Sequence, residues 1–455
     1  MMMAERGYRF LGYTAFFAFV VGLAFVGTDI NIVVIGSALL YLLMQSLRKS
    51  PNGLLVFWLV GVAAFPPWIP FYAVGYRLPA AALISVACIA AAGRNKTKFV
   101  WVDGAVIALV LSTAVGTMFF QTPLHIATQA LLEWGLCYAA GRILFCKSDL
   151  PAICNRVGGV LGLLACLQFL LQFNVASFFP FSVNASGSQW SVLQERGGSI
   201  RSELAFGHSI SLGAVLVILL AFGLKNRARY SYMLSALTIL GVLTTFSRSA
   251  IAATVITVIL TILRSKAAST GKSIAIVLCG FIAYVVASRF VAVVNGAENS
   301  VELTDSTDYR EGLLSLFSIV DLVGLAPGGL PSSLGVTYTW DNFYSIDNGF
   351  LFVGLYSGAI AMALYAAIPL SVVLSKKLKN WDSFSTFIIA QIPFLVTVAP
   401  ITQYQNYYWL FLGMGVSSLH ASGSGEIVKV SASEVPVAKN KPVRRNAYPS
   451  PYSKN

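Results

Sequence analysis

Three ionisable residues stand at the entry to a long apolar run. The stretch RSELAFGHSISLG (201–213) holds Arg201, Glu203 and His208 directly before AVLVILLAFGL, which ends at Lys225. A guanidinium group grips phosphate or carboxylate through paired N–H donors, and a carboxylate or an imidazole can take a proton from a reacting hydroxyl. The stretch therefore combines an anion-binding group with candidate bases where a membrane-length helix begins.

The composition around this stretch is typical of a membrane protein. Of the 455 residues, 57% are hydrophobic and only 11% are charged, whereas a soluble domain carries about 25% charged residues. Crossing the hydrocarbon core as a helix takes roughly 20 apolar residues. We therefore predict an all-α polytopic integral membrane protein with twelve to fourteen transmembrane helices. The candidate spans are 10–27, 30–47, 53–68, 74–92, 100–119, 124–144, 157–174, 205–223, 229–245, 248–264, 272–290, 347–371, 384–400 and 403–420. Between the third and fourth of these, the prolines of AFPPWIPF (64–71) fit a turn or a re-entrant bend equally well.

The net charge of +13 follows the predicted topology. If the N-terminus is cytoplasmic, the short inner loops and the tail carry nearly all of the lysines and arginines, which is the positive-inside pattern. The basic balance is thus no sign of nucleic-acid binding, and both termini are predicted to be cytoplasmic. All basic residues on the outer side are arginines, which suits a face that binds phosphate or carboxylate. They are Arg77, Arg196, Arg201, Arg248, Arg289 and Arg310.

The domain organisation follows from the loops. A transmembrane domain covers 1–420 and carries two larger outer loops, at 175–203 and 291–346; a disordered basic tail is predicted for 421–455. Polar residues gather on the outer rim, with Glu133 as the notable exception within a span. This distribution favours a protein that acts at the outer membrane surface over one that passes a solute through.

The longer outer loop has two features of its own. The stretch DYREGLLSLFSIVDLVGLAPGG (308–329) predicts an amphipathic helix that starts at a Ser306 or Thr307 cap and ends near Gly324. After it, Tyr338, Trp340 and Tyr344 alternate with carboxylates and amides, a pattern that suits the binding of sugar rings. The same aromatics would also fit an interfacial aromatic belt.

Four stretches, in order, resemble the O-antigen ligase/polymerase superfamily, and within it the Wzy-type polysaccharide polymerases. RSELAFGHSISLG resembles the family's Phe-Gly-His entry into a span, and TFSRSAI (245–251) resembles its Thr-x-Ser-Arg turn. The stretch 308–329 resembles the arginine-containing amphipathic segment, and SIDNGFLFVGLYSGAIA (345–361) resembles the entry to the span after the large loop. The resemblance covers about 201–370.

The resemblance implies a metal-independent GT-C glycosyltransferase without a cofactor. Such enzymes polymerise oligosaccharide repeat units carried on undecaprenyl diphosphate into surface polysaccharide, such as O-antigen or exopolysaccharide, at the outer face of the bacterial inner membrane. Its partners would be the lipid-linked glycan, membrane lipids, and a chain-length regulator and a flippase. In the ligases a histidine stands where this chain has Asp347, so the resemblance favours a polymerase.

Candidate roles follow from the chemistry of transfer from a lipid diphosphate. Arg201, Arg248 and Arg310 would stabilise the departing diphosphate, although each could instead reach lipid phosphates or pair with a nearby carboxylate. His208 could bind phosphate, orient an arginine or cap its helix. The candidate bases are Glu195, Glu203 and Asp347, and an N-cap role competes for Asp347 or Asn348. The remaining candidates would bind substrate: Arg196, Tyr338, Trp340, Tyr344 and Asn348.

Three rival functions remain open at this level. A ligase would use the same scaffold with another acceptor. A flippase for lipid-linked oligosaccharides would place its arginines in a central cavity within the spans. A secondary transporter would show paired broken helices.

Overall fold

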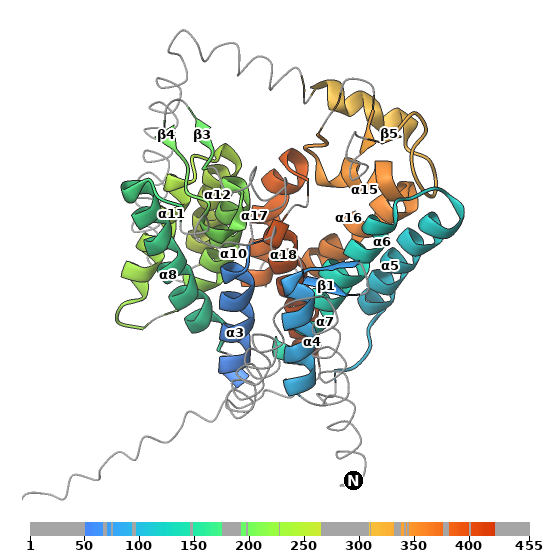
Figure 1. Cartoon of the computed structure of the whole chain (residues 1–455). Coiled ribbons are helices and arrows are strands. Elements are labelled where there is room, and N and C mark those ends of the chain that lie inside the picture. Colours follow the sequence, from blue (N-terminus) through green and yellow to red (C-terminus); the bar gives the residue numbers. More distant parts are fainter. Residues whose placement is uncertain are drawn as a thin grey trace, which may run out of the picture.

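A computed structural model describes most of the chain between Pro51 and Gly423 (Figure 1). The predicted spans 10–27, 30–47 and 272–290 lie outside the described residues, as does nearly all of the predicted tail. The described residues are 51–66, 71–73, 76–92, 97–145, 149–174, 193–196, 199–226, 228–264, 309, 311–331, 338–340, 343, 345–375, 382–399 and 402–423.

The described part is mostly helical, which confirms the all-α prediction. Most of the predicted spans correspond to one helix each, and 124–144 is continuous through a central π-helical turn. The helices are α3 (Pro51–Ala64), α4 (Ala80–Ala92), α5 (Trp101–Phe119), α6 (Leu124–Gln129), η1 (Ala130–Gly135), α7 (Leu136–Leu144), α8 (Leu150–Leu171), η4 (Leu204–Phe206), α10 (Ser209–Gly223), α11 (Ser231–Thr244), α12 (Arg248–Arg264), η5 (Leu316–Ile319), α15 (Gly349–Ser357), α16 (Ala359–Leu374), α17 (Ser383–Thr397) and α18 (Thr402–Gly423). Three short antiparallel hairpins complete the described elements: β1 (Phe71–Ala73) with β2 (Tyr76–Leu78), β3 (Glu195–Arg196) with β4 (Ser199–Ile200), and β5 (Leu330–Pro331) with β6 (Tyr338–Thr339).

The helices form two groups with a shared centre. Helices α8, α10, α11 and α12 gather on one side, and α5, α6, α15 and α16 on the other, with α17 and α18 between them (Figure 1). The β3–β4 hairpin and strand β5 lie at the same end of the molecule. In the predicted topology this end is the outer one.

The predicted spans 53–68 and 74–92 correspond to two helices that are shorter than predicted. Helix α3 ends at Ala64 because Pro66 disfavours helical geometry in the residue before it. Strands β1 and β2 then pair antiparallel before α4 begins at Ala80. The AFPPWIPF stretch therefore separates two short helices, in keeping with the alternative of a turn or bend.

The predicted span 347–371 is also two helices rather than one, divided at Gly358 (φ +91°). The chain just after η5 fills this break: Asp321 O accepts from Ala359 N at 2.7 Å, and Gly324 N donates to Ser357 O at 3.2 Å. These bonds satisfy backbone groups that a broken helix would otherwise leave unpaired. The amphipathic helix predicted to end near Gly324 correspondingly ends at Ile319, since the following residues are needed in the break.

Close contacts between α8 and α11 determine how these two helices pack near their predicted outer ends. A Cβ at Gly162 of α8 would collide with the carbonyl of Leu237, and one at Gly241 of α11 would collide with Gly162 itself. Glycine at both positions lets the two backbones touch. This close packing fixes the position of Thr244, the last residue of α11, along the axis of α8.

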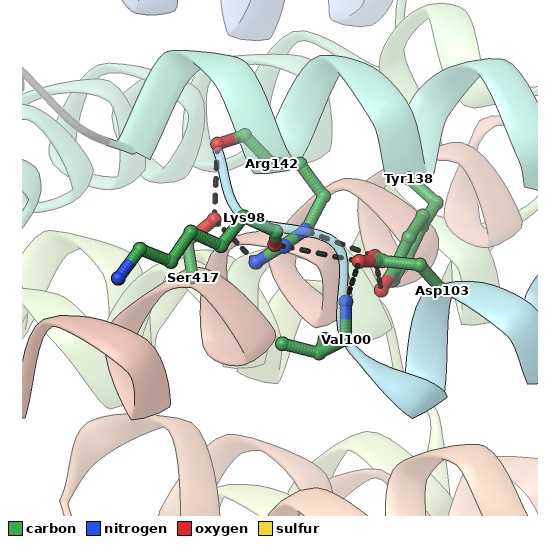
Figure 2. A network of polar contacts seen from close by, with 6 residues as sticks. All are labelled: Lys98, Val100, Asp103, Tyr138, Arg142 and Ser417. Carbon is green, nitrogen blue, oxygen red and sulfur yellow. Dashed lines mark hydrogen bonds and ion pairs between the residues drawn. The ribbon is translucent and has the colours of Figure 1, made fainter. Parts of the chain in front are cut away.

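A buried ion pair ties α5, α7 and α18 together at the opposite end (Figure 2). Arg142 Nε lies 3.0 Å from Asp103 Oδ1, and Arg142 also donates to Ser417 Oγ at 3.1 Å and to Lys98 O at 2.7 Å. Tyr138 donates its hydroxyl to the same Asp103 carboxylate at 2.6 Å. The charges are thus paired and hydrogen-bonded, as burial requires.

Removing one partner of this pair is expected to destabilise the fold. Asp103→Asn leaves the buried Arg142 charge without its counterion and should cost about 3–5 kcal/mol, whereas Tyr138→Phe removes one hydrogen bond and should cost about 1 kcal/mol. Thermal unfolding of the purified protein in detergent measures both. Equal melting temperatures for wild type and Asp103→Asn would contradict a stabilising role.

Two of the described helices are long and apolar enough to cross a membrane: Trp101–Phe119 and Leu150–Leu171, with hydropathies of 1.8 and 1.6. Six further apolar helices are shorter, at 10–17 residues. The outward faces of the two long helices are apolar. Large exposed side chains on them include Ile107, Leu111, Met118, Val160, Leu163, Leu167 and Leu170.

Candidate functional site

The stretch 201–208, called the entry segment below, enters the helix bundle rather than running over it. Ser202 N donates to Thr244 O at 3.0 Å, and Ser202 Oγ donates to Ala165 O at 2.8 Å. Ala165 lies six residues before the end of α8 at Leu171, which is a depth of about 9 Å at 1.5 Å per residue. The entry segment is therefore recessed below the outer end of α8.

Two of the family-like stretches meet at Arg201. This side chain is 7% exposed, and its Nε donates to Thr245 O at 2.9 Å. Thr245 opens the TFSRS turn, and Arg248 begins α12 three residues later in a half-buried position. Two of the three predicted phosphate-binding arginines thus come from segments in direct contact. Arg310 lies outside the described residues.

Glu203 is the most deeply buried of the candidate bases, at 1% exposure. Its Oε1 accepts from Gln194 N at 3.0 Å, whereas its Oε2 has no hydrogen-bond partner among the described residues. Burial raises the pKa of the Glu203 carboxyl to about 7, against the lowering effects of the Gln194 hydrogen bond and the Arg201 charge. A carboxylate with this pKa and one unused oxygen is suited to general-base catalysis near neutral pH.

His208 is a capping residue in this structure. It is the N-cap of α10, and its Nδ1 accepts from Ile210 N at 3.2 Å. Burial, and then the Arg201 charge, lower the pKa of His208 to about 4. The ring is therefore neutral at pH 7, with Nε2–H as its donor. Because α10 begins only at Ser209, Arg201 and His208 do not lie on one helix.

Three of the five described non-glycine residues with positive φ lie in or beside these two family-like stretches, and the other two are Gln121 and Gln172. Leu204 follows Glu203 with φ +49°, Phe246 follows Thr245 with φ +48°, and Thr402, which donates to Ser211 Oγ at 2.8 Å, has φ +51°. Such conformations cost side-chain-bearing residues about 1–3 kcal/mol each. Strain of this kind gathers at functional sites, so its presence in both contacting stretches supports a functional assignment independently of any resemblance.

The Asp347–Asn348 pair sits at the start of α15. Asn348 is 7% exposed, and its Oδ1 accepts from Phe350 N and Leu351 N at 3.0 Å. It is the N-cap, which confirms that alternative for Asn348. Asp347 is half-buried, and its Oδ1 accepts from Ser345 Oγ at 2.7 Å.

The aromatic cluster of the large loop is packed inward at its centre. Trp340 is 0% exposed, and its ring lies 5.3 Å from that of Tyr356. It therefore offers no face to a sugar, which corrects its assignment as a stacking residue. Tyr338 is half-buried and donates its backbone N–H to Tyr356 OH at 2.9 Å.

Other predicted residues are described only in part. Tyr344 lies outside the described residues, and for Arg196 only the backbone, in β3, is described. Glu195, also in β3, is exposed. Glu133 lies in the π-helical turn of Ala130–Gly135 and accepts from Gln405 Nε2 of α18, so this carboxyl is hydrogen-bonded between helices.

Two glutamines at the site were missed by sequence reasoning. Gln168 Oε1 accepts from Glu203 N and Leu204 N, both at 2.8 Å. Gln403 Nε2 donates to Phe65 O at 2.7 Å and to Ala205 O at 2.9 Å. Gln168 lies in the otherwise apolar last two turns of α8, which was an available signal, whereas Gln403 stands among other amides at the start of α18 and nothing in the sequence singles it out.

No known protein family matches the chain by sequence, and no curated protein matches it significantly. The family resemblance therefore rests on the four stretches themselves.

The buried Glu203 carboxyl should make stability depend on pH. Its pKa is about 7 in the folded protein and about 4.5 when unperturbed, so the folded state holds the extra proton between these values. Stability is then highest below about pH 4.5 and falls by about 3 kcal/mol as the pH rises to 7. Glu203→Gln, which stays neutral, should melt at a higher temperature than wild type at pH 8 and at a similar temperature at pH 5. Parallel pH dependences of the two melting temperatures would exclude a raised pKa.

Proposed function

We propose that this chain is a multi-pass membrane glycosyltransferase that polymerises lipid-diphosphate-linked oligosaccharide repeat units at the outer face of the bacterial inner membrane. The observation that carries the proposal is that Arg201 contacts Thr245, at the start of the turn that leads to Arg248, and also acts on the buried Glu203 carboxyl. Glycosyl transfer from a diphosphate requires cations that stabilise the leaving group and a base that takes the proton of the acceptor hydroxyl. Arg201 and Arg248 would supply the cations, and Glu203 would be the base.

A location in the membrane is supported by the surfaces of the helices. The outward faces of α5 and α8 expose large aliphatic side chains along their lengths, for example Leu111 at 58% and Leu170 at 73%. Contiguous apolar surface of this kind is costly in water and favourable against lipid tails. The charge distribution, with lysines absent from the predicted outer loops, supports an orientation in which the entry segment faces the outer side.

The reaction assigns one role to each group. The acceptor hydroxyl attacks C1 of the donor sugar, and the bond between C1 and the diphosphate oxygen breaks. Glu203 takes the hydroxyl proton through Oε2, while Arg201 and Arg248 stabilise the charge that gathers on the departing lipid diphosphate. His208, neutral at pH 7, donates from Nε2–H to a phosphate or sugar oxygen. The products are the extended glycan and the free lipid diphosphate.

A transporter finds less support than a transferase. Helices α15 and α16 do form a broken pair, but segment 321–326 takes up backbone groups at the break. In transporters such breaks instead expose backbone to the solute. The ligase differs from the polymerase only in its acceptor and is distinguished by experiment.

The decisive test is reconstitution. The purified chain in proteoliposomes, given the lipid-linked repeat unit of its own cell, should produce a ladder of glycan lengths without another protein. In cells lacking the chain, single repeat units should still reach the surface. Loss of all surface glycan together with no ladder in vitro would contradict the polymerase and favour a ligase or a flippase.

A further inference from the structure

The contact between α8 and the entry segment assigns a role to a residue outside the family-like stretches. We propose that Gln168 is a positioning residue that holds the Glu203 carboxylate, with its Oε2 free, at the reacting hydroxyl. This rests on the proposed function, because it deepens the account of the same site.

The geometry of the contact is specific. One oxygen, Gln168 Oε1, accepts from two consecutive backbone N–H groups, those of Glu203 and Leu204, each at 2.8 Å. Consecutive N–H groups converge on one acceptor when a residue near the right-handed region precedes a left-handed one. Glu203 has φ −131° and ψ −23°, and Leu204 has φ +49°. The backbone conformation at Glu203 and Leu204 is therefore the one that lets both N–H groups donate to Gln168 Oε1.

The two hydrogen bonds to Gln168 also affect the position of the Glu203 side chain. With its backbone held by Gln168, Glu203 keeps its carboxyl inside the bundle at 1% exposure, where Oε1 is occupied by Gln194 N and Oε2 is unused. Gln168 itself is 4% exposed, and its Nε2 has no hydrogen-bond partner among the described residues. The amide thus has a buried donor that no described group uses.

Without this contact, the turn would relax and the carboxyl could swing toward water. The titratable or charged groups on the elements packed against the entry segment include Arg201 and His208 in the segment, Glu195 on β3, Arg248 at the start of α12, Cys166 on α8 and Tyr407 on α18; α3, which also packs there, has none. None of these sits between Gln168 and the Glu203 backbone, so replacing Gln168 acts on Glu203 directly.

Two substitutions of Gln168 should move the pH profile in opposite directions. Gln168→Leu removes both hydrogen bonds; we expect polymerisation to slow by roughly 10–100-fold, as for a misplaced catalytic group, and the acid limb of the profile to move to lower pH as Glu203 gains solvent. Gln168→Glu keeps an acceptor for both N–H groups but adds negative charge, so the acid limb should move to higher pH. The measurement is the rate of ladder formation in proteoliposomes between pH 5 and 9.

Asn155→Leu is the matched control. Asn155 is also a buried amide on α8, and it bonds Ser231 O at 3.1 Å and Ser235 Oγ at 2.9 Å, far along the helix from the entry segment. The Asn155→Leu substitution should lower the melting temperature without moving the pH profile of polymerisation. Gln168 variants that behave like Asn155→Leu would overturn the positioning role. If Glu203→Gln itself stays active, the fault lies with the base assignment and the proposed function instead.

Discussion

Replacing Arg201 with alanine is expected to reduce polymerisation by at least about 100-fold, which is the usual cost of removing a group that stabilises developing charge. The guanidinium lies at the meeting point of the entry segment and the Thr245–Arg248 turn, and it lowers the pKa of both Glu203 and His208. Its charge therefore acts on both the candidate base and the histidine that caps α10. Arg201→Lys retains the charge but loses the planar set of donors, so partial activity is expected.

The measurement is the glycan ladder from cells that carry each variant as the only copy, at protein levels checked in the membrane fraction. Since Arg201 is also hydrogen-bonded to Thr245 O, the melting temperature of each purified variant must be compared with that of wild type. Arg229→Ala is the control, because Arg229 is exposed and stacks on Tyr230 at 5.6 Å, away from the site. Wild-type chain lengths from a stable Arg201→Ala protein would end the proposal that this residue binds the diphosphate.

The second large effect is expected for Glu203→Gln. The substitution keeps shape and buried volume but removes proton acceptance, so the rate should fall by about 10²–10⁴-fold with little change in KM. Wild type should lose activity as the pH falls through about 7, where burial has placed the pKa of the carboxyl. Residual activity in Glu203→Gln should lack this dependence.

The combination of lost activity and gained stability above pH 7 would be a specific signature. A residue kept for packing alone would not be destabilising at the pH where the protein works. Glu311→Gln, at an exposed carboxylate, serves as the control. Should Glu195→Gln abolish the ladder while Glu203→Gln preserves it, the base would be the exposed carboxylate of β3 and the present assignment would be wrong.

Much of the helical framework was predictable because it is encoded locally. Apolar runs such as 100–119, 229–245 and 248–264 became α5, α11 and α12 with ends within one or two residues. A helix satisfies its own backbone hydrogen bonds, so a run of apolar residues and its flanking breakers suffice to predict it. The polar entry segment before α10 was visible for the same reason.

The sequence by itself determined the all-α class, the segments that carry arginine, and the set of candidate bases. Only the tertiary structure decided which of them act together. The pKa of Glu203 depends on burial within the helix bundle, where Glu203 N donates to Gln168 Oε1 of α8, 35 residues earlier in the chain. The division of 347–371 at Gly358 depends on segment 321–326, and the burial of Trp340 depends on Tyr356. These properties arise from desolvation and from hydrogen bonds between distant segments, and no local pattern of residue types records how such segments come to lie against one another.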